Sequence, residues 1–153
     1  MDLGKALYLL EKVETELGLV YQHLSDTLRA DPEVSKLFSE LAADEESHRV
    51  AVRYQQRLVK MNPDGFKEIH LNLAGLNEIL GLAERVKASR NVSVVDAIKF
   101  AKHVETTAGE HHLKNALSAG NPEIANLLQS LGSGDKQHVA TLTKLLGQRA
   151  GSV

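Results

Sequence analysis

A carboxylate and an imidazole interrupt the apolar stripe of a helix expected over residues 32–61. The stripe advances by steps of three and four residues through Phe38 and Leu41, and its next two positions are Glu45 and His48. Residues three apart on a helix share a face, so both side chains are expected to point toward the core. Burial of a lone carboxylate is very costly, and such groups are normally neutralised, paired or bound to metal.

Further polar residues interrupt the stripes of three other expected helices, namely Glu14, Glu105, Asp135 and His138. Asp135 and His138 are again three residues apart. The inward-facing set therefore holds four carboxylates and two imidazoles, and two divalent cations would make it neutral overall. Oxygen-rich ligation with one imidazole per metal suits iron or manganese, while zinc and cobalt could also bind.

Four long helices are expected to position these residues, over 2–30, 32–61, 94–119 and from 122 onward. Asp31-Pro32 matches the residue preferences of a helix start, and Asn121-Pro122 repeats this signal. Apolar residues around Glu14 follow a heptad repeat, which is typical of helices in a left-handed bundle.

The linker over residues 66–92 decides the topology of the expected bundle. Its leucine-rich segment, 71–86, predicts a shorter helix. A connection of this length can cross from one end of a bundle to the other, so the second and third long helices are expected to run parallel. The small, polar tail at 147–153 is expected to be frayed.

The chain contains an internal repeat. Residues 31–48 align with residues 121–138 at an offset of 90, and five of the 18 positions are identical. Upstream, Glu14 aligns with Glu105 at an offset of 91. We interpret the chain as two copies of a helical hairpin, each with one carboxylate on its first helix and carboxylate-x-x-His on its second.

Composition limits the function classes. A length of 153 residues suits one domain, and a net charge of −2 gives no basic footprint for nucleic acid or anionic membrane. The absence of cysteine excludes disulfides, thiolate nucleophiles and iron–sulfur centres built from this sequence. With no signal peptide and no 18-residue apolar run, we expect a cytoplasmic protein without a transmembrane segment.

Over nearly its whole length the sequence resembles the rubrerythrin branch of the ferritin-like superfamily. Besides the six polar residues, the resemblance rests on Tyr21 seven residues after Glu14 and on Phe38 seven residues before Glu45. It implies an all-α, ferritin-like four-helix bundle of two duplicated hairpins, the arrangement known for dimetal carboxylate proteins.

The resemblance also implies roles for individual residues around two metal ions, with iron as the expected metal. Glu45 and Asp135 would bridge the metals and Glu14 and Glu105 would be terminal ligands, while His48 and His138 would each give one nitrogen. Tyr21 is assigned as a catalytic residue, with a core tyrosine bonded to a buried carboxylate as the alternative. His112 is either a further ligand or a partner of one, with plain packing in the bundle as the alternative. The flanking acids Asp44 and Glu46 are assigned to the solvated face.

The implied function is that of a dimetal oxidoreductase that reacts with hydrogen peroxide or dioxygen, of erythrin or ferroxidase type. Its electron donor would be external, because the Cys-rich rubredoxin module of the family is missing from this sequence. A homodimer or larger homo-oligomer is also implied. The alternatives are a non-catalytic metal-binding or iron-storage bundle, and a helical interaction module without metal.

Two departures from the family pattern bear on this function. Asp135 stands where the family has Glu and is shorter by one methylene, which affects one of the two expected bridges. Ala108 stands where rubrerythrins carry an additional Glu one turn beyond the ligand Glu105. The ligand switch associated with that Glu is therefore not carried over to this chain.

Overall fold

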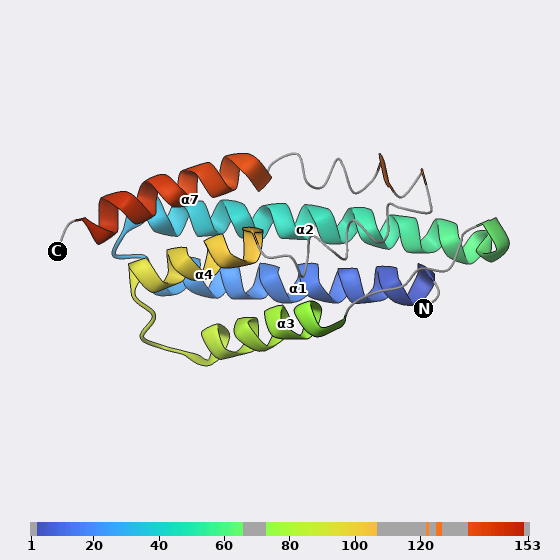
Figure 1. Ribbon diagram of the computed structural model, residues 1–153, viewed down its shortest axis with the longest axis horizontal. Helices are drawn as coiled ribbons and strands as arrows, with labels where there is room; N and C mark the ends of the chain where they lie inside the picture. The colour runs from blue at the N-terminus through green and yellow to red at the C-terminus, as the bar shows by residue number, and fades with distance from the viewer. Residues whose placement is uncertain (1–2, 66–72, 107–121, 123–124, 127–134, 152–153) are drawn as a thin grey trace.

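The computed structural model describes residues 3–65, 73–106, 122, 125–126 and 135–151 (Figure 1). All regular structure in these residues is helical, which confirms the predicted all-α fold class. The elements are α1 (Leu3–Thr27), α2 (Pro32–Met61), the 3-10 turn η1 (Pro63–Gly65), α3 (Leu73–Ala88), α4 (Val94–Thr106) and α7 (Asp135–Ala150).

The helices are arranged as the predicted bundle with a long crossover. α1 and α2 form an antiparallel hairpin in contact along its length, and α4 packs against α7. α3 lies along α1 and returns the chain to the end at which α2 began, so α4 runs parallel to α2 (Figure 1). The short helix predicted within residues 71–86 is thus present as the crossover helix α3.

Local sequence signals explain where the helices begin. The Asp31 side chain accepts a hydrogen bond from the backbone amide of Val34 and caps α2, with Pro32 in the first turn. The Ser93 hydroxyl caps α4 in the same way, by accepting from the amide of Asp96 at 3.1 Å. Both starts lie at the predicted positions, whereas α1 ends at Thr27, before the predicted residue 30.

The C-terminal end of α7 differs from the expectation of fraying beyond residue 146. The helix continues through Gly147 to Ala150. Arg149 anchors it, since its Nε lies 2.8 Å and its terminal nitrogen 3.2 Å from the two carboxylate oxygens of Asp31. This contact joins the end of α7 to the start of α2, and the guanidinium holds the pKa of Asp31 below its usual range.

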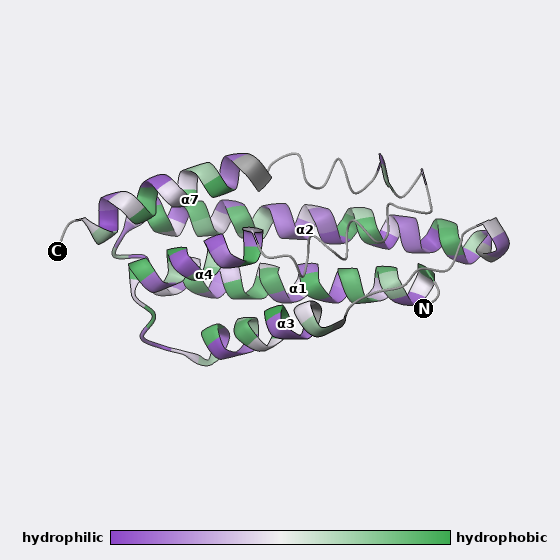
Figure 2. Cartoon of the chain, viewed as in Figure 1, coloured by the Kyte–Doolittle hydropathy of each residue, from purple (hydrophilic) through white to green (hydrophobic). Residues whose placement is uncertain are grey.

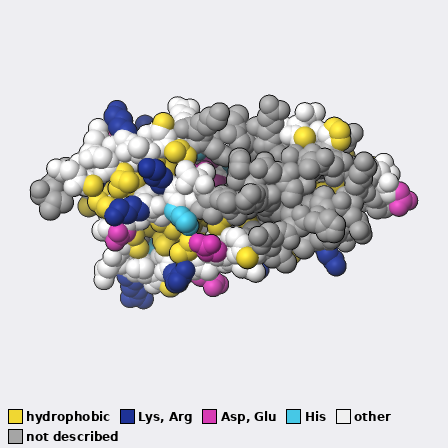
Figure 3. Space-filling model, viewed as in Figure 1, with side chains coloured by type: hydrophobic (Ala, Val, Ile, Leu, Met, Phe, Trp, Pro, Cys, Tyr) yellow, Lys and Arg dark blue, Asp and Glu magenta, His cyan; other side chains and the backbone are white. Residues whose placement is uncertain are grey.

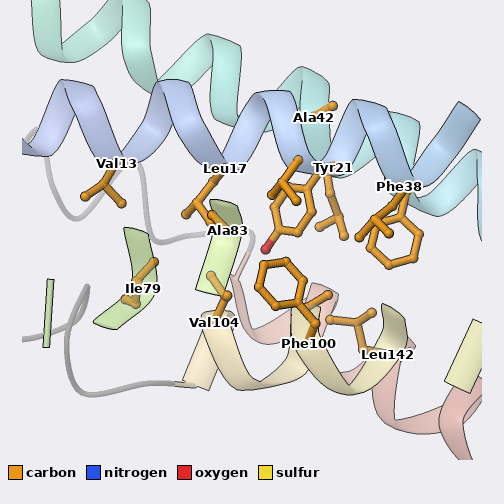
Figure 4. Close-up of a cluster of buried hydrophobic side chains, with 14 of the residues drawn as sticks. Val13, Leu17, Tyr21, Phe38, Ala42, Ile79, Ala83, Phe100, Val104 and Leu142 are labelled. Carbon is orange, nitrogen blue, oxygen red and sulfur yellow. The ribbon is translucent and has the colours of Figure 1, made fainter. Parts of the chain in front are cut away.

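Apolar side chains from all four long helices meet in one core. Along each helix apolar and polar residues alternate around the axis, as Figure 2 shows. In Figure 4, Tyr21 and Phe38 meet Phe100 and Leu142, and all four are buried. The Tyr21 ring centroid is 5.9 Å from that of Phe38 and 6.4 Å from that of Phe100, distances typical of aromatic pairs.

The surface carries mixed charge. On the face seen in Figure 3, basic and acidic side chains of the described residues lie among one another. Within the described ranges no helix combines the length and the apolarity needed to cross a membrane.

Candidate metal centre

Three of the six predicted ligands converge in the structure. Glu14 comes from α1, and Glu45 and His48 come from α2. One ligand atom from each lies within 4.8 Å of the other two. His48 Nδ1 is 3.4 Å from Glu14 Oε2 and 3.5 Å from Glu45 Oε2, so the imidazole faces both carboxylates. A single helical hairpin supplies the whole cluster.

The close approach of α1 and α2 at this level depends on a small residue. Gly18 lies one turn after Glu14, and a Cβ added to it would lie 3.6 Å from the Cβ of Glu45. A larger side chain at position 18 would therefore meet the backbone and Cβ region of α2. Glu45 and His48 share a face of α2 because they are three residues apart, so both project toward Glu14.

The cluster is almost closed to water. The side chains of Glu14, Glu45 and His48 are 0%, 5% and 14% exposed. Two carboxylates so close together in a buried site favour a proton or a cation between them. Carboxylate oxygens with one imidazole nitrogen form a donor set suited to a divalent metal such as iron or manganese. The chemistry of these residues therefore fits the metal implied by the sequence pattern.

Glu105 lies on α4 and is connected to α1 through Tyr21. The Tyr21 hydroxyl donates a hydrogen bond to Glu105 Oε1 at 3.1 Å, and the tyrosine itself is fully buried. This geometry agrees with the interpretation of Tyr21 as a core tyrosine bonded to a carboxylate. Glu105 is outside the three-residue cluster, and its role as a metal ligand stays a prediction.

His138 has a different neighbour from the one expected. On α7 its Nε2 lies 2.8 Å from Asp44 Oδ2, and it does not join the cluster of Glu14, Glu45 and His48. The assignment of Asp44 to the solvated face is therefore wrong in part. Its side chain is 47% exposed, yet it bridges α2 to α7. Asp44 lies beside the apolar stripe of α2, and the spacing of buried positions gives no signal for a contact there.

Other predicted positions give a mixed outcome. Glu46 does lie on the solvated face, where its carboxylate binds Arg49, and the guanidinium lowers the pKa of Glu46. Asp135 is the first residue of α7, but its side chain lies outside the described part of the structure, as do His112 and Ala108 altogether. Their predicted roles stay predictions.

A polar network beside the cluster was not predicted from the sequence. Glu11, one turn before Glu14, lies 3.4 Å from Arg53 and 3.8 Å from Arg49, and it accepts a hydrogen bond from Gln56 at 2.8 Å. Its side chain is only 19% exposed. These contacts fix the register of α1 against α2 next to the candidate ligands. The available signal was the spacing of Arg49 and Arg53, which are four residues apart and therefore share a face of α2.

A groove follows the surface between α1 and α2 and reaches one member of the cluster, Glu14. It has a volume of about 390 Å³, and Glu14 is among its lining residues together with Gly18, Ala42 and Ala43. Small side chains on both helices create this groove.

Comparison with known protein families identifies the chain's family. A protein-family model described as rubrerythrin matches residues 11–146, a range that contains all six predicted ligands and Tyr21. No curated protein and no solved structure matches the chain.

Proposed function

Because the chain belongs to the rubrerythrin family, we propose that its carboxylate–histidine cluster is part of a di-iron centre that reacts with hydrogen peroxide or dioxygen. The observation that carries the proposal is the convergence of Glu14, Glu45 and His48 in a buried site. An ordinary core would place apolar residues at these positions, and three polar groups facing one another there need a cation or protons to be stable.

The residues of the chain have distinct tasks in this proposal. Glu14 and His48 would hold one metal and Glu105 and His138 the other, with Glu45 and Asp135 between them. Bound ferrous iron would supply the two electrons that, with two protons, convert one hydrogen peroxide into two waters. The burial of Glu14 and Glu45 keeps bulk water away from the centre. The Tyr21 hydroxyl orients the carboxylate of Glu105 by donating to it.

An external reductant completes the cycle in this proposal. The sequence contains no cysteine and so cannot form a Cys-ligated iron centre for electron transfer. We expect the electrons to come from a donor outside these 153 residues.

Non-catalytic metal binding or storage is the alternative function. Two residues favour it. Ala108 stands where the family has an additional Glu, and Asp135 stands where the family has the longer Glu as the bridging residue. Both reduce the number or reach of carboxylate oxygens around the second metal. A centre altered in this way could bind iron without turning over peroxide.

Anaerobic titration of the metal-free protein with Fe²⁺ tests metal binding. We expect two irons per chain, as in the dimetal bundle proteins. Glu14→Gln and Glu105→Ala should each lose at least one iron while the far-UV circular dichroism stays helical. Glu16→Gln is the matched control, because this glutamate lies on the same helix but pairs with Lys87 at 3.3 Å. Absence of tight iron, or equal stoichiometry in all variants, would refute the proposed centre.

A pulse of hydrogen peroxide then separates the two functions. Fast growth of ferric absorbance in the loaded wild-type protein, followed by repeated turnover with a chemical reductant, supports the oxidoreductase. Two irons that oxidise only slowly would contradict it and leave the storage function.

A further inference from the structure

The groove between α1 and α2 has no task in the proposed function. It has a volume of about 390 Å³, and Glu14 is one of its lining residues, whereas Glu45 and His48 are not. The Glu14 side chain is 0% exposed, so it lies at the inner end of the groove. A solute that enters the groove therefore meets Glu14 before the other two members of the cluster.

The polar side chains that line the groove present oxygen atoms. They are the carboxylates of Glu14 and Glu46, the hydroxyls of Thr15 and Ser39, and the amide of Gln22. No basic side chain is among the lining residues in the part of the chain that the structure describes. Because hard divalent cations prefer oxygen ligands, the lining favours a cation over an anion.

The groove is large enough for a cation that still carries its water. One water molecule occupies about 30 Å³ in the liquid, so an ion with about six waters needs roughly 200 Å³. This is about half of the groove volume of about 390 Å³. The ion can thus keep its hydration until it reaches Glu14, where protein ligands replace the water and offset the cost of burying the charge.

Gly18 leaves the space in front of Glu14 open. A helical side chain covers the turn that precedes its own residue, so a side chain at position 18 would lie over Glu14. An added Cβ would lie 3.6 Å from the Cβ of Glu45 and 3.9 Å from the carbonyl oxygen of Ala42, which are ordinary contacts. Helix packing therefore does not require glycine in preference to alanine, although glycine is the less favourable residue inside a helix.

We propose that this groove is the route by which divalent cations enter the centre, and that Gly18 and Ala43 determine its width. The inference rests on the proposed function, because it requires that the cluster binds a metal. Gly18 lines the groove from α1, and Ala43, which is exposed, lines it from α2. A larger side chain at either position would narrow the route without replacing a ligand.

Ala43→Leu and Gly18→Ala test the route. Ser47→Leu is the control for the first, because Ser47 is exposed one turn further along α2 and does not line the groove. Gly81→Ala is the control for the second, because Gly81 lies in α3 and an added Cβ would meet no atom of the described residues within 4 Å. Stopped-flow visible absorbance follows Co²⁺ binding to the metal-free protein without oxygen, and excess chelator then gives the release rate.

Both groove variants should slow the binding and the release of Co²⁺ by the same factor. A narrower route raises a single barrier that the ion crosses in both directions, so the dissociation constant stays unchanged. For Ala43→Leu we expect both rate constants to fall about tenfold, which corresponds to about 1.4 kcal/mol of additional barrier. The decrease should be smaller for Gly18→Ala, because a methyl group fills less of the groove. Both controls should match wild type.

Association rates in the groove variants equal to those of their controls would overturn the inference. Slower association with an unchanged release rate would overturn it as well, because the dissociation constant would then rise and the substitution would have changed the ligands themselves. Wild-type protein that binds neither Co²⁺ nor Fe²⁺ would instead refute the proposed centre, and the entry route with it. The two failures are therefore distinguishable.

Discussion

The hydrogen bond between Tyr21 and Glu105 connects the first hairpin to α4, and Tyr21→Phe removes it while keeping the ring. The hydroxyl donates at 3.1 Å to Glu105 Oε1. The ring is fully buried against Phe38 and Phe100, so phenylalanine can occupy the same space with the same aromatic contacts. The substitution therefore isolates the contribution of one oxygen atom.

The burial of the two partners sets the size of the effect. A hydrogen bond to a charged group contributes about 1.5–3 kcal/mol to stability, and a neutral one about 0.5–1.5 kcal/mol. Glu105 is partly exposed, so water can replace the lost donor, which reduces the cost. We expect Tyr21→Phe to lower the free energy of unfolding of the metal-free protein by about 1–2 kcal/mol. At this chain length each kcal/mol corresponds to about 2–4 °C in Tm.

Urea denaturation followed by circular dichroism measures the change. Tyr8→Phe is the matched control, because Tyr8 lies on the same helix and is 63% exposed. Its stability should equal that of wild type. If Tyr21→Phe were as stable as this control, the hydroxyl would contribute nothing to the free energy of unfolding. The hydrogen bond between Tyr21 and Glu105 would then not stabilise the packing of α4 against α1.

Two further outcomes are expected from other parts of the fold. Gly18→Ala should raise the urea midpoint, because removal of a helical glycine stabilises by about 0.5–1 kcal/mol. The added Cβ would lie 3.6 Å from the Cβ of Glu45, which is an ordinary van der Waals distance. A lower midpoint would show that the helices cannot accept the methyl group. Asp31→Asn should be less stable than wild type at neutral pH, because it keeps the cap but loses the charge that binds Arg149. Since Arg149 lowers the pKa of Asp31, this contribution is complete above the ordinary carboxyl pKa and is lost as the pH falls through the lowered value. The difference in urea midpoint should therefore close in acid, and a difference that is constant with pH would contradict the assignment.

The features that follow from backbone periodicity were predictable from the sequence. Asp31-Pro32 fixes the start of α2, because an N-cap acceptor followed by proline satisfies a helix start locally. Glu14, Glu45 and His48 could be placed together because each interrupts an apolar stripe, and stripes of adjacent helices must face one core. These inferences need only the helical period and the cost of burying polar groups.

Contacts at the edges of the helices were not predictable in this way. Asp44 meets His138, and Glu11 meets Arg53, through side chains that lie beside the stripes. Whether two such groups touch depends on the rotation of each helix about its axis and on side-chain rotamers. The helical period of the sequence determines neither the helix rotation nor the rotamers accurately enough to predict a contact of 2.8 Å. The same limit explains why Arg149 was assigned to a frayed tail although it binds Asp31.

The internal repeat in the sequence predicts two equivalent hairpins, but the two halves of the candidate centre are unequal. The first hairpin supplies Glu14, Glu45 and His48, whose ligand atoms already lie within 4.8 Å of one another. In the second, Asp135 replaces Glu, and His138 is reached by a carboxylate from the first hairpin. One half of the centre is thus organised within a single hairpin, whereas the other depends on the packing of α7 against α2. If both halves bind metal as proposed, we expect the two ions to be held with different affinities, because only one half is organised within a single hairpin.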